Sequence, residues 1–170
     1  MVQEQSLQGQ GVRVLVYDTE ADGLLDAATT IHCAVTKMDG VVTQYTPVDI
    51  TRFISDLSNL GDDTVIVCHN QLGYDLRLME KLYGYRHRGV VLDTLVMSRL
   101  LNPERLGRHG LESWGERLGR SKPSHEDWSR FTPAMLHRCK EDTEINYLVY
   151  KALMKEGGLN EYDLLQLPSY

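Results

Sequence analysis

Hydrophobic and polar residues alternate along this chain in blocks that predict a mixed α/β fold. Short, nearly uninterrupted apolar runs, which are typical of buried strands, are separated by stretches with apolar residues at helical spacing. The predicted strands are residues 12–17, 31–36, 41–45, 65–68 and 90–92. The predicted helices are a first one that ends at Leu60, then 75–83, 94–101, 111–118 and 133–154. Asp49 or Thr51 is the expected N-cap of the first helix, and Thr132 that of the last.

The order of these elements indicates a sheet with both strand orientations. Asp39-Gly40 lies between the second and third strands and is a strong hairpin signal, so the first three strands are expected to be antiparallel neighbours. The later strands alternate with helices, which favours parallel pairing. We therefore predict a mixed α/β sheet with helices on both faces, in a single domain of residues 12–156. Residues 1–11 are expected to form a mobile tail and residues 157–170 a C-terminal extension.

Two carboxylates follow the first apolar run. Asp18 and Glu20 are two residues apart, so on a strand both side chains point to the same face, roughly 6.5 Å apart along the chain. Like charges in this arrangement repel each other and resist burial unless cations lie between them. Hard divalent metals prefer such oxygen ligands. The alternative is an ordinary solvated strand end.

Two further acidic positions extend this pattern. Asp75 stands at the start of a predicted helix, after the strand 65–68, where capping of the helix is its ordinary role. Asp142 lies on the last predicted helix, where a solvated charged face is the ordinary explanation. With Asp18 and Glu20, they make a set of four carboxylates that could hold metal ions.

Together these elements resemble the DEDD family of metal-dependent 3′→5′ exonucleases. The segment from Asp18 to Leu24 is similar to the first motif of that family, the segment 69–75 to the second, and Asp142 fits the last carboxylate. The resemblance is strongest to the proofreading domain of phage A-family DNA polymerases and extends from Arg13 to Met154. It implies a ribonuclease H-like sheet and two Mg²⁺ or Mn²⁺ ions, with Asp18, Glu20, Asp75 and Asp142 as metal ligands and catalytic residues.

The family has two branches, which differ in their general base. One branch uses a Tyr four residues before the last Asp, and the other uses a His five residues before it. Here position 138 is Arg and position 137 is His, so His137 is the expected base. Residues five apart on a continuous helix point roughly 140° away from each other, so we expect a helix break or a mobile segment at His137. An exposed helix histidine is the alternative, and His125 is the next candidate base.

The resemblance also suggests substrate contacts. Leu24 is a candidate wedge between the last two bases, with a core leucine as the alternative. Asn70 is a candidate contact to the terminal nucleotide, although it could equally order its turn. Trp114 and Trp128 are expected to be core residues. The candidate phosphate contacts are Arg86, His87, Arg88, Arg105, Arg108, Lys122, Arg130 and Arg138.

Charge and composition indicate the kind of binding partner and the cellular compartment. The net charge of −6 argues against a nucleic-acid partner, but residues 84–140 hold eleven Lys or Arg and six Asp or Glu. A carboxylate centre beside a basic flank suits a site that binds metals and then a polyanion. The three cysteines have no metal-binding spacing and favour a reducing compartment. With no apolar run long enough to span a membrane and no signal peptide, we expect a cytoplasmic protein of a bacterial or phage-infected cell.

The expected activity is 3′→5′ hydrolysis of single-stranded DNA from its 3′ end to nucleoside monophosphates. An RNA or oligoribonucleotide 3′→5′ exonuclease uses the same residues, since only contacts to the 2′-position would separate the two. An inactive nucleic-acid-binding domain is the alternative of another class, although all four carboxylates are present. The expected partner is nucleic acid, with a DNA polymerase as a further candidate. No membrane partner is expected.

Overall fold

The computed structural model describes residues 11–169 of the chain. Its strands are β1 (Arg13–Ala21), β2 (Ile31–Met38), β3 (Val41–Tyr45), β4 (Thr64–Cys68) and β5 (Val91–Asp93). A 3₁₀ turn, η1 (Pro47–Asp49), precedes the first helix. The helices are α1 (Ile50–Ser58), α2 (Asp75–Tyr83), α3 (Thr94–Leu101), α4 (Leu111–Arg117), α5 (Pro133–Gly157) and α6 (Glu161–Leu164).

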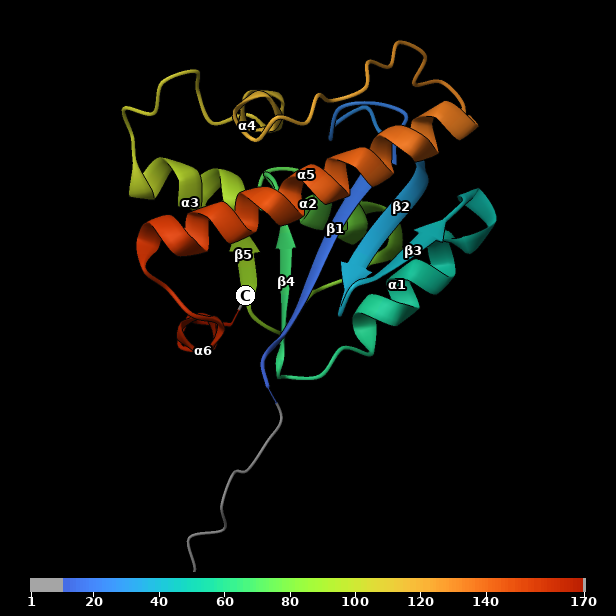
Figure 1. Ribbon diagram of the computed structural model, residues 1–170. Coiled ribbons are helices and arrows are strands. Elements are labelled where there is room, and N and C mark those ends of the chain that lie inside the picture. Colours follow the sequence, from blue (N-terminus) through green and yellow to red (C-terminus); the bar gives the residue numbers. More distant parts are fainter. Residues whose placement is uncertain (1–10, 170) are drawn as a thin grey trace, which may run out of the picture.

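The five strands form one mixed sheet in the order β3-β2-β1-β4-β5 (Figure 1). The first three strands are antiparallel neighbours, and β4 and β5 run parallel to β1. The predicted ribonuclease H-like mixed sheet is therefore confirmed. The central strand β1 is longer than predicted, because its pairing with β2 continues past Tyr17 through Asp18 and Glu20 to Ala21.

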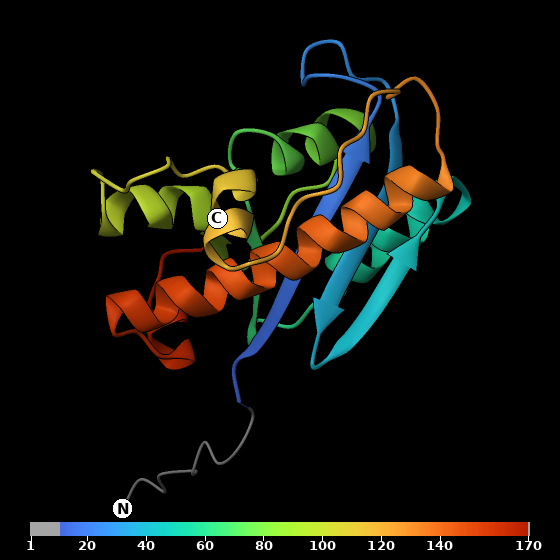
Figure 2. The same ribbon diagram turned by 45° about the horizontal axis from the view of Figure 1, so that its top comes forward.

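Helices cover both faces of the sheet. On one face, α1 and α2 bury apolar residues such as Phe53 and Met79 against Tyr17 and Ile66. On the other face, α3, α4 and α5 bury a second cluster around Val16, in which Ile145 is fully covered. Each such apolar side chain contributes roughly 1.5–3 kcal/mol by leaving water. Figure 2 shows α5 crossing β1 and β2, which places this helix over the centre of the sheet.

The long helix α5 is well defined at both ends. The Thr132 side chain accepts a hydrogen bond from the Met135 amide, and Pro133 fills the first helical position. The helix then runs without interruption to Gly157, and Gly158 ends it with a φ of +61°. Beyond it, Leu164 of α6 is buried against the same cluster as the end of α5.

The ends of the chain add little to the fold class. The predicted N-terminal tail lies, apart from Gly11, outside the described residues. Between residues 11 and 169, no helix has both the length and the apolar character that a lipid bilayer requires.

Candidate active site

Four carboxylates meet where the end of β1, the start of α2 and the helix α5 come together. Oxygen atoms of Asp18, Glu20 and Asp142 lie within 4.8 Å of one another. Asp75 joins them through Asp18, because ligand atoms of Asp18, Asp75 and Cys68 also lie within 4.8 Å of one another. The sequence-predicted metal ligands thus come from three distant segments and gather at one place.

The first part of the site depends on the alternation of side chains along β1. Val16, Asp18 and Glu20 point to the face covered by α5, because successive side chains of a strand face opposite ways. The Cys139 thiol of α5 lies 3.4 Å from the Asp18 carbonyl oxygen, to which it donates. This contact helps to hold Asp142, one turn further along α5, against the strand.

Asp75 is held from the opposite side of β1. The Thr19 hydroxyl donates to the Asp75 carboxylate over 2.6 Å, and Asp75 is almost fully buried. The residue at the N-cap of α2 is Tyr74, and its side chain makes no capping hydrogen bond. Asp75 is the first helical residue, so the capping role considered from sequence does not account for it.

The loop before Asp75 is shaped by a single buried carboxylate, Asp93. Its oxygens accept hydrogen bonds from the amides of Asn70, at 2.9 Å, and Leu72, at 3.0 Å. The same side chain caps α3 through the amides of Leu95 and Val96. The loop between β4 and α2 is therefore tied to the start of α3.

Burial and mutual repulsion make these carboxylates reluctant to ionise. The pKa of Glu20 is raised to about 7, first by burial and then by the negative charge of Asp142. Burial likewise raises the pKa of Asp75 to about 6 and raises the pKa values of Asp18 and Asp142. Such a cluster favours any cation that can neutralise it.

Two basic side chains provide part of that neutralisation. The Lys122 ammonium lies 2.7 Å from an oxygen of Asp142, and Arg138 Nε lies 3.3 Å from an oxygen of Glu20. Arg138 is also 3.9 Å from Asp142, one helical turn away. Both had been predicted only as phosphate contacts. The sequence gives no direct signal for their pairing, because it depends on the path of the loop 118–132.

His137 is not brought to this cluster. The expected helix break is wrong: α5 is continuous from Pro133 to Gly157, so His137 is exposed and turned away from Asp142, while Arg138 faces the carboxylates. The role of His137 as general base stays a prediction. His125, the next candidate, packs edge-on against the Trp128 ring with centroids 4.8 Å apart.

A cavity of about 370 Å³ opens beside Glu20. Leu24, Tyr74 and Trp128 line it, and the Leu24 side chain is 82% exposed, which excludes the core role considered for it. Asn70 is also exposed and has a φ of +67°, consistent with a residue that shapes its turn. Trp128 is half-buried at the cavity, so its predicted core role holds only in part.

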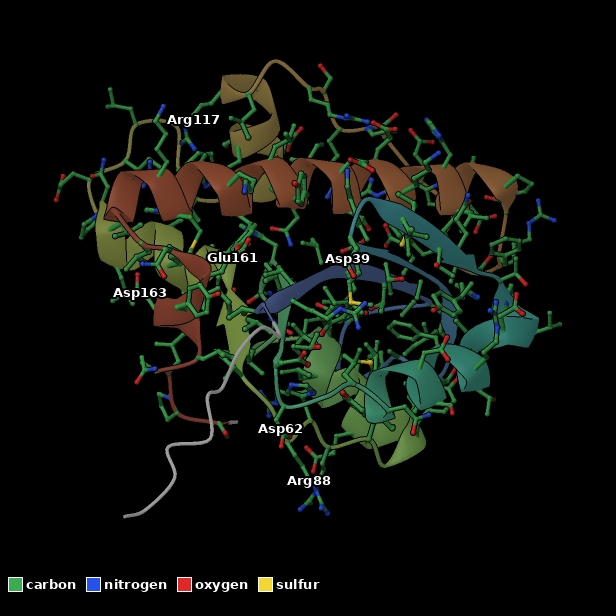
Figure 3. All side chains as sticks on the ribbon, turned by 60° about the horizontal axis from the view of Figure 1, so that its bottom comes forward. Asp39, Asp62, Arg88, Arg117, Glu161 and Asp163 are labelled. Carbon is green, nitrogen blue, oxygen red and sulfur yellow. The ribbon has the colours of Figure 1, made fainter. Side chains whose placement is uncertain are left out.

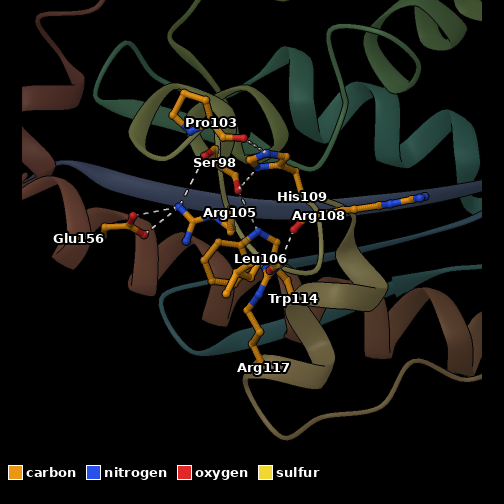
Figure 4. A network of polar contacts seen from close by, with 9 residues as sticks. All are labelled: Ser98, Pro103, Arg105, Leu106, Arg108, His109, Trp114, Arg117 and Glu156. Carbon is orange, nitrogen blue, oxygen red and sulfur yellow. Dashed lines mark hydrogen bonds and ion pairs between the residues drawn. The ribbon is translucent and has the colours of Figure 1, made fainter.

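Several other candidate phosphate contacts have structural roles or lie elsewhere. Arg105 pairs with Glu156 at 2.9 Å and stacks on Trp114, which is a core residue as predicted (Figure 4). Arg88 lies near Asp62 at the start of β4 and points away from the body of the molecule (Figure 3). That end of the sheet is opposite to the carboxylates.

The acidic cluster fits divalent metal ions. Its donors are carboxylate oxygens, which suit Mg²⁺ and Mn²⁺, and one oxygen of Asp142 is buried without a hydrogen-bond partner among the described residues. The nearby Cys68 thiol is a poor ligand for such ions, because burial raises its pKa and keeps it protonated.

Sequence comparison finds relatives among phage polymerases. The DNA-directed DNA polymerase of Enterobacteria phage T3 is 32% identical over 141 residues, which is 67% of this chain and 20% of the polymerase. That of Escherichia phage T7 is 30% identical over the same shares. The chain therefore spans about a fifth of the length of the curated relatives it matches. No family model matches the chain.

Solved structures share the fold at lower identity. Brucella melitensis NrnC with bound Mg²⁺ has a TM-score of 0.66 at 19% identity, covering 93% of this chain and 81% of that one. NrnC has also been solved bound to pGG, with a TM-score of 0.65 at 18% identity, covering 89% of this chain and 76% of that one. Escherichia coli RNase D, described as an exoribonuclease, has a TM-score of 0.65 at 17% identity, covering 90% of this chain and 44% of that one.

Proposed function

Since the chain belongs to the DEDD family of 3′–5′ exonucleases, we propose that it hydrolyses single-stranded DNA from the 3′ end and releases nucleoside monophosphates. One observation carries this proposal. Oxygens of Asp18, Glu20 and Asp142, which come from two segments far apart in the sequence, lie within 4.8 Å of one another, and Asp75 adjoins them. A buried group of carboxylates this dense costs stability unless cations neutralise it, which supports a catalytic rather than a structural role.

The carboxylates are proposed to hold two divalent ions, Mg²⁺ or Mn²⁺. Asp18, Glu20 and Asp142 would hold one ion, and Asp18 with Asp75 would hold the other. When bound, such a pair lowers the pKa of a coordinated water and stabilises the charge on the leaving 3′-oxygen. Thr19 fixes Asp75 through its 2.6 Å hydrogen bond, so this ligand is oriented before the metal binds.

The cavity beside Glu20 is proposed to receive the 3′-terminal nucleoside. Its volume of about 370 Å³ and its apolar wall suit a nucleobase. Leu24 stands exposed at this cavity, where it could insert beside the terminal base, and Asn70 lies on the loop that leads to Asp75. The Tyr74 hydroxyl donates to the Gly23 carbonyl over 2.6 Å, which joins the two segments that line the cavity.

The general base is not evident among the described residues near the carboxylates. His137 could reach them only if the first turn of α5 unwound, because the helix is continuous through this residue. Arg138 cannot accept a proton at neutral pH. We therefore propose Arg138 as a contact to the substrate phosphate. His137 remains the candidate general base, and its mutation tests this role.

An RNA exonuclease is the second candidate function. The structural similarity to NrnC, which has been solved bound to pGG, and to RNase D favours it, whereas the sequence similarity to phage DNA polymerases favours DNA. The sequence identity to the polymerases is higher, so we place DNA first. The same similarity makes a DNA polymerase a proposed partner, within a bacterial or phage-infected cytoplasm.

Matched 5′-labelled DNA and RNA oligomers, incubated with Mg²⁺, Mn²⁺ or EDTA, test the proposal. We expect a ladder that shortens one nucleotide at a time from the 3′ end, faster on DNA than on RNA, and no reaction in EDTA. A circular single strand is the control, since an exonuclease cannot cut it. Cleavage of the circle at the linear rate would refute the proposal, and faster shortening of RNA would establish the second candidate.

A further inference from the structure

Two cations are built into the acidic cluster itself. Lys122 Nζ lies 2.7 Å from Asp142 Oδ2, and Arg138 Nε lies 3.3 Å from Glu20 Oε1. The side chains are only 21% and 17% exposed, so both pairs lie largely out of water. The oxygens that they contact belong to the same carboxylates that are proposed to hold the first metal ion.

The Arg138 guanidinium is held in place by three kinds of contact. Its Cζ lies 4.8 Å from the centre of the Trp128 ring, and its Nη1 donates to the Pro123 carbonyl over 3.2 Å. Its Nε, which faces Glu20 and Asp142, is buried and lacks a well-oriented hydrogen-bond partner among the described residues. Arg138 is thus anchored to the loop 122–128 and coupled only by charge to the carboxylates.

Lys122 and Arg138 compete with a divalent ion for the same ligands. A carboxylate oxygen that pairs with an ammonium group at 2.7 Å cannot also coordinate Mg²⁺ at about 2.0–2.1 Å without bringing two cations close together. Asp142 Oδ1 has no hydrogen-bond partner among the described residues, but an ion bound there would still repel the Lys122 ammonium on the neighbouring Oδ2, so metal binding weakens the pair and favours movement of the side chain.

We propose that Lys122 and Arg138 are displaceable cations, which neutralise the metal-free site and transfer to the substrate phosphate when the metal ions bind. This inference rests on the proposed function. Arg138 is suited to the transfer, because its planar fork of donors matches phosphate oxygens. The consequence is cooperativity: substrate stabilises the displaced side chains, so metal and nucleic acid bind more tightly together than alone.

Metal affinity without nucleic acid tests the displacement. Lys122→Met and Arg138→Met keep an unbranched apolar stem and remove the charge, and Arg138→Lys keeps the charge. Arg130→Met, at an exposed arginine of the loop 118–132, is the control. In calorimetric Mn²⁺ titrations we expect both methionine variants to bind metal about tenfold more tightly, within the range typical of coupled sites, and Arg138→Lys and Arg130→Met to bind like the wild type. Equal or weaker affinity in the methionine variants would overturn the proposal.

Trp128 emission supplies a readout independent of activity. Because Arg138 stacks on this ring, we expect metal binding to change the emission of the wild type and not that of Arg138→Met. Trp128→Phe removes the signal and so separates it from that of Trp114. An emission unaffected by saturating metal would mean that Arg138 stays in place, which overturns its displacement.

The activity of the wild type distinguishes a failure of the proposed function from a failure of the inference about Lys122 and Arg138. If the wild type binds no metal, or binds it without hydrolysing DNA or RNA, the proposed function fails. If the wild type binds metal and hydrolyses its substrate while the affinities and the emission stay constant, only the inference about Lys122 and Arg138 fails. Circular dichroism of each variant verifies that the fold is intact.

Discussion

Glu20→Gln should change how the stability of the metal-free protein depends on pH. The pKa of Glu20 is raised from its ordinary value of 4.5 to about 7, first because the side chain is buried and then because Asp142 repels its charge. The folded protein therefore holds this proton more tightly than the unfolded chain does. The associated stability is fully present below pH 4.5 and is lost as the pH rises to about 7.

The size of the effect follows from the shift in pKa. About 1.4 kcal/mol corresponds to each unit, so the shift at Glu20 amounts to roughly 3 kcal/mol of unfolding free energy across this window. In a protein of this length that corresponds to roughly 6–12 °C in melting temperature. Asp18, Asp75 and Asp142 act in the same direction, because their pKa values are also raised.

Urea unfolding in EDTA at pH 5 and pH 8 measures the effect. We expect the wild type to be clearly less stable at pH 8, and Glu20→Gln to lose the part of this difference that Glu20 contributes, because glutamine stays neutral and no longer repels Asp142. Glu126→Gln, at an exposed position, is the matched control and should behave like the wild type. An unchanged pH dependence in Glu20→Gln would refute the reasoning.

Three further substitutions test the site. Asp142→Asn should lower hydrolysis by at least about 10²–10³-fold, yet leave the unfolding free energy in EDTA nearly unchanged, because relief of repulsion offsets the lost pair with Lys122; full activity would contradict the metal assignment, and Asp26→Asn is the exposed control. His137→Ala should lower the single-turnover rate by about 10²–10⁴-fold, the usual contribution of a positioned base, which here requires that the first turn of α5 unwinds; a nearly wild-type rate would exclude His137 as the base. Leu24→Ala should raise the KM about tenfold through lost apolar contact with the terminal base, compared with an unaffected exposed control, Leu106→Ala; an equal KM would exclude the wedge.

The pattern of apolar residues predicts most of this fold, because the buried faces of helices and strands are apolar and each has its own spacing. The bounds of α2 and α3 agree with the prediction from the sequence, and the hairpin at Asp39-Gly40 joins β2 to β3 as expected. The end of β1 was placed too early, since Asp18 and Glu20 are polar and their place in the sheet depends on pairing with β2.

The sequence predicted only those site residues that belong to motifs of recognisable spacing. The four carboxylates follow from motifs, and the structure places them together. The pairing of Lys122 with Asp142 does not follow, because the loop 118–132 has no periodicity and its path is set by tertiary contacts. The helix break at His137 was expected because a general base at this position would have to reach the same site as Asp142. The cap at Thr132 and the burial of apolar side chains along α5 favour a continuous helix instead.

The hydrogen bonds of Asp93 determine which parts of the protein unfold locally together. Its carboxylate holds the amides of Asn70 and Leu72 on one side and the start of α3 on the other, while its own strand, β5, has only three residues and lies at the edge of the sheet. Detachment of this short edge removes the bonds that order the loop before Asp75. The edge strand and the second acidic motif should therefore open as one cooperative unit, with amide protons that exchange at similar rates. The order of Asp75, a proposed metal ligand beside the central strand, thus depends on the stability of the strand at the edge of the sheet.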